Sequence, residues 1–484
     1  MIIASIAGPS MDQALQQVTA VSRHADLMEF RLDMIAKAEI GRLLRSTRKP
    51  KIATCRPVWE GGGFAGREAD RIEILEAASL LGADYVDIEY DAGEAIIRSF
   101  MRRRRETRVI VSKHLFSRVP FRVQTVYRQL HATGADVIKF AYRAEDAADI
   151  VPAVDFLALA RSDHRKAVAI AMDEPGEASR ILYRRFGGWA TYASSGTGES
   201  AAPGQVPAWQ LRSLYRAHAL TSRTRVFGVI GNPVRQSRGI YVHNAVFQKN
   251  GINAVYCRFA VADLGRFMRT VMPLLGGCSV TLPHKERIVR YLDSVDSTAR
   301  AIGAVNTIFR RAGKLTGTNT DAAAALEAIE DVTDVRGKRL LIIGAGGASR
   351  AIAYEALIRG ARVLIANRTE ARSRRLAEQL GAVHVKMTDV ARVPFDILVN
   401  ATSVGMYPAV SEIPVPEAIL AGKVVFDVVY NPPLTRLLRA AKEAGGRIVP
   451  GTAMYINQAA RQSRLFTRKE PDLRLMRRVF HRQG

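Results

Sequence analysis

Short apolar runs alternate with longer segments of helical periodicity over the first 220 residues of the chain. Each run is rich in residues that favour strands and is therefore predicted to form one. The runs are IIASIA (2–7), DLMEFRL (26–32), KIATCR (51–56), DYVDIEY (84–90), RVIVSKH (108–114), DVIKFA (136–141), AVAIAMD (167–173) and WATYAS (189–194). Between them, segments such as READRIEILEAASLLGA (67–83) carry apolar residues at helical spacing, which predicts amphipathic helices.

Eight strand-helix units in about 220 residues predict a parallel (β/α)8 barrel, with a doubly wound open sheet as the lesser alternative. In such a barrel every strand points its C-terminal end toward the same mouth, where catalytic groups gather. The charged residues at these ends are Glu29, Arg31, Arg56, Glu89, His114 and Lys139. One lysine in an apolar strand is ordinary on an edge strand, but the convergence of several strands favours a catalytic site.

Lys139 has a plain chemical interpretation at such a mouth. In an apolar environment beside arginines the ammonium form is disfavoured, so that more of the side chain is the neutral, nucleophilic amine. That amine can condense with a ketone, and the resulting iminium makes an adjacent C–H acidic. His114 is suited to take this proton near neutral pH, and elimination of a β-hydroxyl would follow.

Six motifs occur in order over nearly all of residues 1–220: EFRLD (29–33), TCRPVWEGG (54–62), SKHLF (112–116), IKFA (138–141), EASR (177–180) and APGQ (202–205). Together they resemble the type I 3-dehydroquinate dehydratases. The resemblance implies that Lys139 forms a Schiff base, that His114 is the general acid and base, and that Glu60 orients it. It also implies a carboxylate clamp and further substrate contacts, namely Arg180, Glu29, Arg31, Arg56 and Gln205.

Two departures from the family pattern affect this first site. The family has serine directly before Ala-Pro-Gly-Gln, whereas this chain has Ala201 there and Ser200 one place earlier, so one hydroxyl contact is not carried over. The residues flanking His114 are Lys113 and Leu115, where the family has a polar residue and an acidic or amide residue. The lysine–histidine pair is retained, so activity is expected, with an altered affinity.

The strand pattern restarts at SRTRVFGVIGNPV (222–234), which places a boundary at about Thr221. Further on, KRLLIIGAGGASRAIAYEAL (338–357) reads as a strand, a glycine turn and a helix. Such a turn lets the backbone approach a pyrophosphate at the helix N-terminus, although Ser349 stands in place of the usual third glycine or alanine. The predicted cofactor-binding residues of this turn are Gly344, Ala345, Gly346, Gly347 and Ala348.

The end of the next strand, in ARVLIANRTEAR (361–372), bears on which cofactor binds. An NAD site generally has an acid here for the ribose hydroxyls, but this chain has Asn367, Arg368, Thr369 and Arg372, which favour a 2′-phosphate. NADP is therefore predicted rather than NAD. The ordinary alternative is an exposed basic turn.

CSVTLPHKE (278–286), GAVNTI (303–308) and GTNTDAAA (317–324) place a lysine, an asparagine and an aspartate near presumed turns. Hydride transfer to a ketone creates an alkoxide, and a Lys–Asp pair can supply the proton it needs. With VNATSVGM (399–406), FDVVYNPPLTRLL (426–438) and GTAMYINQAA (451–460), this half resembles shikimate dehydrogenase over 221–484. The resemblance implies catalytic roles for Lys285 and Asp321 and substrate contacts at Ser237, Thr281, Asn306, Tyr430 and Gln458.

The segment QSRGIYVHN (236–244) departs from the Ser-x-Ser pattern of shikimate dehydrogenases. Gly239 replaces the second serine and Ile240 stands where proline is usual. Loss of that hydroxyl removes a donor and is expected to open space beside the ring carbon that bears the carboxylate, which in quinate carries an extra hydroxyl. A quinate-preferring dehydrogenase therefore stays an alternative.

The two halves fit together chemically, because dehydration of 3-dehydroquinate yields the ketone that the second half would reduce. The prediction is a bifunctional enzyme with a dehydratase barrel at 1–220, a substrate domain at 221–325 completed by helices of 456–484, and an NADP-binding Rossmann-like domain at 326–455. A non-catalytic metabolite-sensing protein is the alternative from another class.

Charge and composition limit the possible partners. The net charge is +25, of which +5 belongs to residues 1–220 (31 basic minus 26 acidic) and +20 to the remainder (40 minus 20). No basic motif interleaved with aromatic residues accompanies this charge, so small anionic substrates are expected rather than nucleic acid. The three scattered cysteines and nine scattered histidines predict a reducing cytoplasm and no bound metal.

No apolar stretch reaches membrane-spanning length, and the start MIIASIAGPSMD is expected to be a first strand rather than a signal. A membrane partner is therefore not expected, and the oligomeric state is left open.

Overall fold

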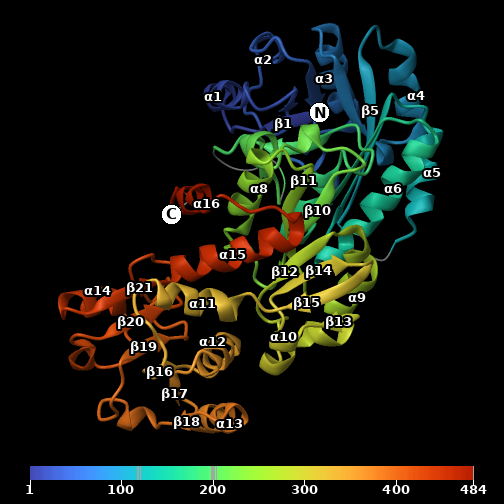
Figure 1. Ribbon diagram of the computed structural model, residues 1–484. Helices are drawn as coiled ribbons and strands as arrows, with labels where there is room; N and C mark the ends of the chain where they lie inside the picture. Colours follow the sequence, from blue (N-terminus) through green and yellow to red (C-terminus); the bar gives the residue numbers. More distant parts are fainter. Residues whose placement is uncertain (117–118, 120, 198–201, 203, 483–484) are drawn as a thin grey trace. The chain divides into compact units, whose positions relative to one another are not determined.

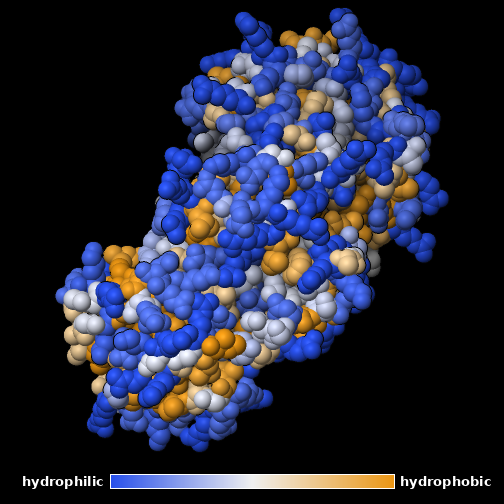
Figure 2. All heavy atoms as spheres, in the orientation of Figure 1, coloured by the Kyte–Doolittle hydropathy of each residue, from blue (hydrophilic) through white to orange (hydrophobic). Residues whose placement is uncertain are grey.

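The computed structural model describes residues 1–116, 119, 121–197, 202 and 204–482 (Figure 1). The chain divides into two compact units, each described by itself: Met1–Ile240 with Gly251–Leu275, and Tyr241–Asn250 with Gly276–Gly484. Hydrophilic and hydrophobic residues are interspersed on the face seen in Figure 2. Within the described ranges, no helix is long and apolar enough to cross a membrane.

All eight strands predicted for the first 220 residues are present, and they pair in parallel. They are β1 (Ile2–Ile6), β2 (Leu27–Arg31), β3 (Lys51–Thr54), β4 (Tyr85–Glu89), β5 (Arg108–Leu115), β6 (Val137–Arg143), β7 (Ala167–Met172) and β8 (Thr191–Ser194). Hydrogen-bonded neighbours follow the order β7-β6-β5-β4-β3-β2-β1-β8, and a short strand, β9 (Val206–Pro207), pairs with β8.

Side chains from all eight strands meet in one interior cluster, which requires the sheet to curl into a barrel. The members include Ile3, Leu27, Ile52, Tyr85, Ile110, Val137, Val168 and Tyr192. Because side chains alternate along a strand, the residue two places after Val137 also points inward, and this residue is Lys139. The barrel is thus apolar in its lower layer and polar toward the C-terminal strand ends, and the open-sheet alternative is wrong.

The helices between these strands cover the outside of the barrel (Figure 1). They are α1 (Met11–Val21), α2 (Ile40–Arg45), α3 (Glu68–Leu80), α4 (Glu94–Arg103), α5 (Val123–Ala132), α6 (Val151–Ser162) and α7 (Glu177–Leu182). Helix α5 illustrates the amphipathic pattern, because Val123, Val126, Tyr127 and Leu130 recur at helical spacing and are buried.

The first unit continues beyond the barrel into β10 (Arg225–Gly231), β11 (Ala254–Ala260) and α9 (Leu264–Thr270). Strands β10 and β11 pair in parallel, and α7 of the barrel packs against β11. Asp146, on the barrel, accepts hydrogen bonds from the backbone N–H groups of Ala262 (2.6 Å) and Asp263 (2.9 Å). Arg266 also pairs with Asp149 of the barrel at 2.6 Å. The start of the second half is thus fixed to the barrel by polar contacts.

The second unit contains a small sheet in which β12 (Gly277–Val280), β14 (Thr307–Arg311) and β15 (Lys314–Thr318) pair antiparallel. Strand β13 (Ser294–Val295) pairs in parallel with β15. Helices α10 (Ser297–Ile302) and α15 (Gly451–Thr467) pack against this sheet, and α16 (Leu473–His481) packs against α15. Helix α11 (Asp321–Glu330) packs against α15 and against the core of the parallel sheet described next, and α8 (Gly239–Lys249) begins in the first unit.

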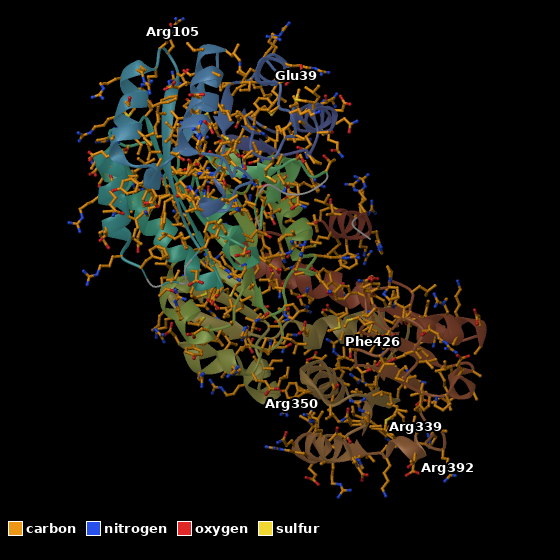
Figure 3. All side chains as sticks on the ribbon, turned by 180° about the vertical axis from the view of Figure 1, so that it is seen from behind. Glu39, Arg105, Arg339, Arg350, Arg392 and Phe426 are labelled. Carbon is orange, nitrogen blue, oxygen red and sulfur yellow. The ribbon has the colours of Figure 1, made fainter. Side chains whose placement is uncertain are left out.

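A six-stranded parallel sheet forms the remainder of the second unit, in the order β18-β17-β16-β19-β20-β21. Its strands are β16 (Arg339–Ile343), β17 (Arg362–Ala366), β18 (Val383–His384), β19 (Ile397–Asn400), β20 (Val424–Asp427) and β21 (Arg447–Pro450). Its helices are α12 (Gly347–Ile358), α13 (Glu370–Leu380) and α14 (Arg436–Glu443). Buried clusters lie on both faces; Phe426 of β20, labelled in Figure 3, belongs to one of them. This order is that of a Rossmann domain, as predicted.

Candidate active sites

A cavity of about 410 Å³, counting its open mouth, lies at the C-terminal end of the barrel strands. Its lining residues are Ser5, Glu29, Arg31, Arg56, His114, Lys139, Ala141, Ile170, Met172, Arg180, Tyr192, Ala202 and Gln205. Alternation along each strand explains this list, because Glu29 and Arg31 stand above Leu27 just as Lys139 stands above Val137. The structure thus brings together seven of the eight residues predicted for this site, and Glu60 lies behind His114.

The amine of Lys139 is buried and has two carboxylates and an aromatic ring around it. Its Nζ lies 2.8 Å from Asp87 Oδ2 and 3.9 Å from Glu29 Oε1. The centroid of the Tyr192 ring is 4.1 Å away. The expectation of an apolar mouth is therefore wrong in this respect, because two carboxylates lie beside the amine.

His114 and Glu60 form a pair beside this amine. Nδ1 of His114 is 2.8 Å from Glu60 Oε2, which leaves Nε2 as the ring nitrogen available to a ligand. Burial lowers the pKa of His114 well below its usual range, and Arg56 and Lys139 act in the same direction. Burial also raises the pKa of Glu60 to about 8, although Arg56 opposes this shift. The imidazole is therefore neutral, and its Nε2 can accept a proton when Glu60 is ionised and accepts a hydrogen bond from Nδ1–H.

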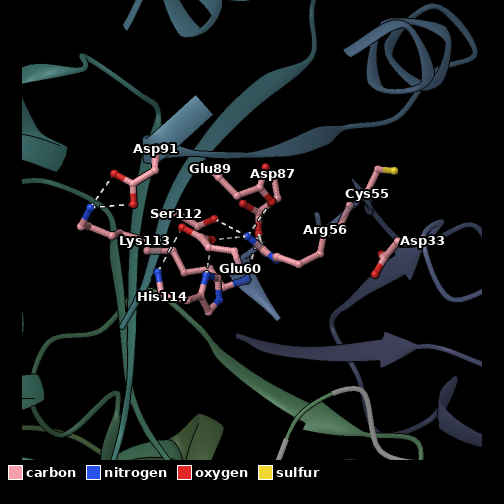
Figure 4. A network of polar contacts seen from close by, with 12 residues as sticks. Asp33, Cys55, Arg56, Glu60, Asp87, Glu89, Asp91, Ser112, Lys113 and His114 are labelled. Atoms are coloured by element: carbon pink, nitrogen blue, oxygen red, sulfur yellow. Dashed lines mark hydrogen bonds and ion pairs between the residues drawn. The ribbon is translucent and has the colours of Figure 1, made fainter. Parts of the chain in front are cut away.

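Arg56 joins the buried carboxylates of the site (Figure 4). Its Nη1 donates to Glu89 Oε1 at 2.7 Å, to Ser112 Oγ at 2.8 Å and to Glu60 Oε2 at 3.2 Å. Its Nη2 donates to Asp87 Oδ2 at 2.7 Å. Arg56 lines the cavity, as expected of a substrate contact, but its guanidinium is also the support of three carboxylates.

Asp87 is a charged residue of this site that the sequence reasoning missed. It is fully buried and contacts both Arg56 and Lys139. Burial opposes its ionisation, but Arg56 and Lys139 hold the pKa of Asp87 well below its usual range. The signal was present, because Asp87 precedes Glu89 by two residues in DYVDIEY and so shares its inward face. Glu89, noted at a strand end, instead pairs with Arg56 and with the buried Arg71.

The other side of the cavity carries groups suited to hydroxyls and a carboxylate. Glu29 accepts from Ser5 Oγ at 2.6 Å, and Gln205 Nε2 donates to the same hydroxyl at 3.3 Å. Arg31 binds both oxygens of Asp33, at 2.9 and 2.6 Å. Arg180 is buried, and burial lowers the pKa of its guanidinium to about 10, which makes an anionic ligand favourable beside it.

The two departures from the dehydratase family pattern concern residues at different places in the structure. Ser200 and Ala201 lie outside the described residues, while Ala202 lines the cavity. Lys113 points to the opposite side of β5 from His114, and its Nζ is 2.7 Å from both carboxylate oxygens of Asp91. It therefore does not line the cavity.

In the second unit, Lys285 and Asp321 form the predicted pair. Nζ of Lys285 donates to Asp321 Oδ2 at 2.6 Å, and both side chains are partly accessible. Asp321 is the first residue of α11, and its backbone N–H donates to Asn319 Oδ1 at 3.0 Å. The carboxylate is thus held at a helix start, where its negative charge is favoured.

Asn306 is buried and is linked to this pair through Thr320, the residue before Asp321. Its Oδ1 accepts from Thr307 Oγ1 at 2.7 Å and from the backbone N–H of Thr320 at 2.8 Å. Asn306 thus fixes the turn that leads into Asp321. Gln462, which sequence reasoning did not single out, extends the network by donating to Thr307 Oγ1 at 3.0 Å.

The other predicted contacts of this half occupy several elements. Thr281 directly follows β12, and Gln458 is half-buried on α15. Tyr430 packs against the ring of Tyr455, with 5.2 Å between centroids. In the first unit, the carbonyl of Ser237 accepts from Arg258 Nε at 3.3 Å and Nη2 at 3.1 Å.

Gly239 does not have open space beside it. A Cβ at this position would lie 3.1 Å from Cε1 and 3.3 Å from Oη of Tyr256, and 3.4 Å from Ser237 Oγ. The Tyr256 ring and Ser237 thus bound one side of the space beside Gly239.

The glycine turn of the second unit has the backbone geometry of a phosphate site. Gly344 has φ +125, and a Cβ there would lie 2.8 Å from Ser349 Oγ and 2.9 Å from the Ala401 carbonyl. A Cβ at Gly346 or Gly347 would meet nothing within 4 Å. Gly346 precedes α12 and no side chain caps the helix, so its first N–H groups face this open space.

Comparisons with known proteins agree with both halves. The model of type I 3-dehydroquinase matches residues 2–222, that of the shikimate dehydrogenase substrate binding domain matches 229–308, and that of shikimate / quinate 5-dehydrogenase matches 326–412. A chloroplastic bifunctional 3-dehydroquinate dehydratase/shikimate dehydrogenase from Arabidopsis thaliana is 36% identical over 496 residues, or 96% of this chain and 82% of the relative. The chain belongs to this bifunctional family.

Proteins that correspond only to the dehydrogenase half are also similar to this chain. A shikimate dehydrogenase (NADP(+)) from Pyrococcus furiosus is 42% identical over 267 residues, covering 54% of this chain and 96% of that protein. A crystal structure of shikimate dehydrogenase in complex with NADP+ superposes with a TM-score of 0.51 at 37% identity, covering 55% of this chain and 97% of that one. A quinate dehydrogenase from Corynebacterium glutamicum in complex with NAD has a TM-score of 0.51 at 31% identity, covering 54% of this chain and 99% of that one.

The chain therefore acts at two steps of the shikimate pathway, as a 3-dehydroquinate dehydratase and as a shikimate dehydrogenase. Its first half is a lyase, and its second half is an NADP-dependent oxidoreductase. The prediction of two activities is confirmed, and the non-catalytic sensing alternative is set aside.

The residues of the nucleotide domain fit NADP. The open backbone at Gly346 and Gly347 leaves room for the pyrophosphate at the start of α12. Beyond β17, Asn367 Nδ2 donates to the Thr369 carbonyl at 2.9 Å, which shapes the turn. Arg368 is exposed on this turn and Arg372 is exposed in the first turn of α13, where their charges would favour a 2′-phosphate.

Proposed function

We propose that Lys139 forms a Schiff base with 3-dehydroquinate. The observation that carries this proposal is a buried amine in a cavity that His114 also lines. Lysine ammonium and ketone combine to iminium and water, so the positive charge stays on the same nitrogen. The proton that the amine gives up before it attacks leaves with the carbinolamine hydroxyl as water.

His114 is the proposed base of the elimination. Its neutral Nε2 takes the proton from the carbon next to the iminium, and the imidazolium then protonates the departing β-hydroxyl, which leaves as water. Glu60 holds Nδ1 at 2.8 Å and so fixes the orientation of the ring. Hydrolysis of the iminium releases 3-dehydroshikimate and restores the amine of Lys139.

The remaining residues of the cavity are proposed to bind substrate. Arg180, which is buried and lines the cavity, would receive the carboxylate. Glu29, Gln205 and Arg31 offer acceptors and donors for the ring hydroxyls. Arg56 lines the same cavity and also holds Glu60, Asp87 and Glu89 in place.

Borohydride trapping with 3-dehydroquinate, followed by mass mapping, tests the Schiff base. The reduced adduct should be on the peptide that contains Lys139, and Lys139→Ala should abolish both trapping and dehydration. Lys113→Ala is the matched control, because this lysine lies on the adjacent strand β5, points away from the cavity and pairs with Asp91. An adduct on any other lysine, or full dehydration by Lys139→Ala, would refute the proposal.

For the dehydrogenase we propose that Lys285 supplies the proton to the alkoxide and that Asp321 holds its ammonium. The 2.6 Å pair at the start of α11 supports this assignment. NADPH, when bound, supplies the hydride. Ser237, Thr281, Asn306, Tyr430 and Gln458 are proposed substrate contacts, and Asn306 also positions Asp321 through Thr320.

Oxidation of NADPH with 3-dehydroshikimate measures this role. Lys285→Met should lower kcat by about two orders of magnitude, the usual contribution of a positioned proton donor. The dehydratase activity of the same chain is the internal control and should not change. An unaltered kcat would show that the proton comes from elsewhere.

Shikimate is proposed to be preferred over quinate. The Tyr256 ring lies close to Gly239 and limits the room for the extra hydroxyl of quinate on that side. Oxidation rates with shikimate and quinate decide the question, and a faster rate with quinate would favour the alternative.

The domain boundaries near 220 and 325 are retained as part of this proposal.

We further propose a reducing cytoplasm and small-molecule partners. Cys55, Cys257 and Cys278 are free thiols and buried. Burial raises the pKa of Cys55 and Cys278 to about 12, which keeps both protonated and unreactive. Mass spectrometry of the native protein after alkylation under denaturing conditions should find all three thiols modified.

A further inference from the structure

Tyr192 is a residue of the dehydratase cavity that no motif singled out. It lies on β8, is 3% exposed, and lines the cavity together with Lys139. The ammonium nitrogen of Lys139 lies over its ring, 4.1 Å from the centroid. A cation at this distance from an aromatic face is attracted by the ring quadrupole, and the attraction is strongest where water is excluded.

The other partners of this nitrogen act differently. Asp87 accepts a hydrogen bond from the ammonium at 2.8 Å, and Glu29, 3.9 Å away, acts through its charge. When ammonium and ketone become iminium and water, the nitrogen keeps its positive charge but its N–H groups fall from three to one. Hydrogen bonding to Asp87 is thereby reduced, whereas attraction to a ring face requires only the charge.

We propose that Tyr192 is a further catalytic residue of the dehydratase, whose ring face stabilises the positive charge on the Lys139 nitrogen in the iminium. This inference rests on the proposed Schiff base at Lys139. The ring acts while the carbon next to the iminium loses its proton and the hydroxyl departs.

The hydroxyl of Tyr192 can be separated from this role. It is buried and makes no hydrogen bond with the described residues. Removing it should therefore cost no stabilising contact, so Tyr192→Phe retains the ring face and changes little else. Tyr192→Met fills much of the same volume with a flexible apolar chain but offers no ring face.

The experiment measures the rate and the endpoint of borohydride trapping with 3-dehydroshikimate, together with kcat of dehydration. Tyr192→Phe should stay close to the native protein, and Tyr192→Met should trap roughly tenfold more slowly. The trapping endpoint should remain one adduct per chain on Lys139 in each variant. A loss of folded protein would lower the endpoint instead, so the two effects are distinguished.

A second series keeps the fold constant. Phenylalanine at position 192 carrying one, two and three fluorine atoms has nearly the same shape but a progressively weaker ring quadrupole. The trapping rate should fall with each fluorine. Equal rates across this series, or a Tyr192→Phe variant as slow as Tyr192→Met, would overturn the inference. Failure of the native protein to label Lys139 would instead overturn the proposed Schiff base.

Discussion

Arg56→Met is expected to destabilise the barrel by an amount that follows from its contacts. Its guanidinium nitrogens lie 2.7 Å from both Asp87 and Glu89. At an effective dielectric constant of about 20, each such pair attracts by about 6 kcal/mol. Desolvation offsets much of this, and removal of one partner of a buried pair typically costs about 3–5 kcal/mol. Asp87 keeps Lys139 and Glu89 keeps Arg71, so we expect a loss in this range rather than the sum.

The stability lost in Arg56→Met should depend on pH. Burial opposes ionisation of Asp87, yet Arg56 and Lys139 hold its pKa well below the usual range, so this carboxylate stabilises the native protein above pH about 4. Without Arg56, the buried carboxylates should have native pKa values above their unfolded values. A carboxyl of this kind stabilises the native protein below its unfolded pKa, and this stabilisation is lost as pH rises through its native pKa. The free energy of unfolding of Arg56→Met should therefore fall below that of the native protein by a larger amount at pH 8 than at pH 5.

Tryptophan fluorescence during urea unfolding measures this effect in the barrel alone, because Trp59, Trp189 and Trp209 all lie in the first 220 residues. Dehydrogenase activity of the same chain serves as a folding control. Arg67→Met is the matched variant, since its pair with Asp70 is exposed and should contribute nothing measurable. Equal stability of Arg56→Met and native protein, or a deficit that does not change between pH 5 and pH 8, would refute the reasoning.

Three further outcomes are expected. Asp321→Asn should lower kcat for 3-dehydroshikimate with little change in the KM for NADPH, as steady-state kinetics can check, because it removes the ionic partner of the proposed proton donor. Arg368→Ala with Arg372→Ala should raise the KM for NADPH about tenfold or more and leave that for NADH unchanged, since only the former has a 2′-phosphate. Gly344→Ala should abolish NADPH binding in calorimetry, because φ is +125 and the new Cβ would lie 2.8 Å from Ser349 Oγ.

The barrel was predictable because the same alternation that buries Val137 and Ile110 also turns Lys139 and His114 inward. Once eight such strands are recognised, their polar inward residues must converge at one mouth. The Rossmann order likewise follows from a glycine turn between a strand and a helix. These features depend on local periodicity, which a single sequence displays directly.

Pairing between distant segments was not predictable in the same way. Asp87 was missed, and the charged environment of Lys139 with it, because strand register decides that β4 presents a carboxylate to β6 across the interior. Arg56 was interpreted as a substrate contact alone for the same reason. The Tyr256 ring beside Gly239 depends on how β11 lies against the preceding loop, which residue type at 239 does not reveal.

The attachment of β10, β11 and α9 to the barrel has a consequence for how this gene can be divided. A cut at Thr221 follows the motif boundary, yet it would leave Asp146 and Asp149 without the backbone N–H groups of Ala262 and Asp263 and the guanidinium of Arg266. The two halves of the chain therefore cannot be exchanged as independent units. A dehydratase taken from this chain would need new polar partners on that face, and swapping in a foreign barrel would require the same acidic pair.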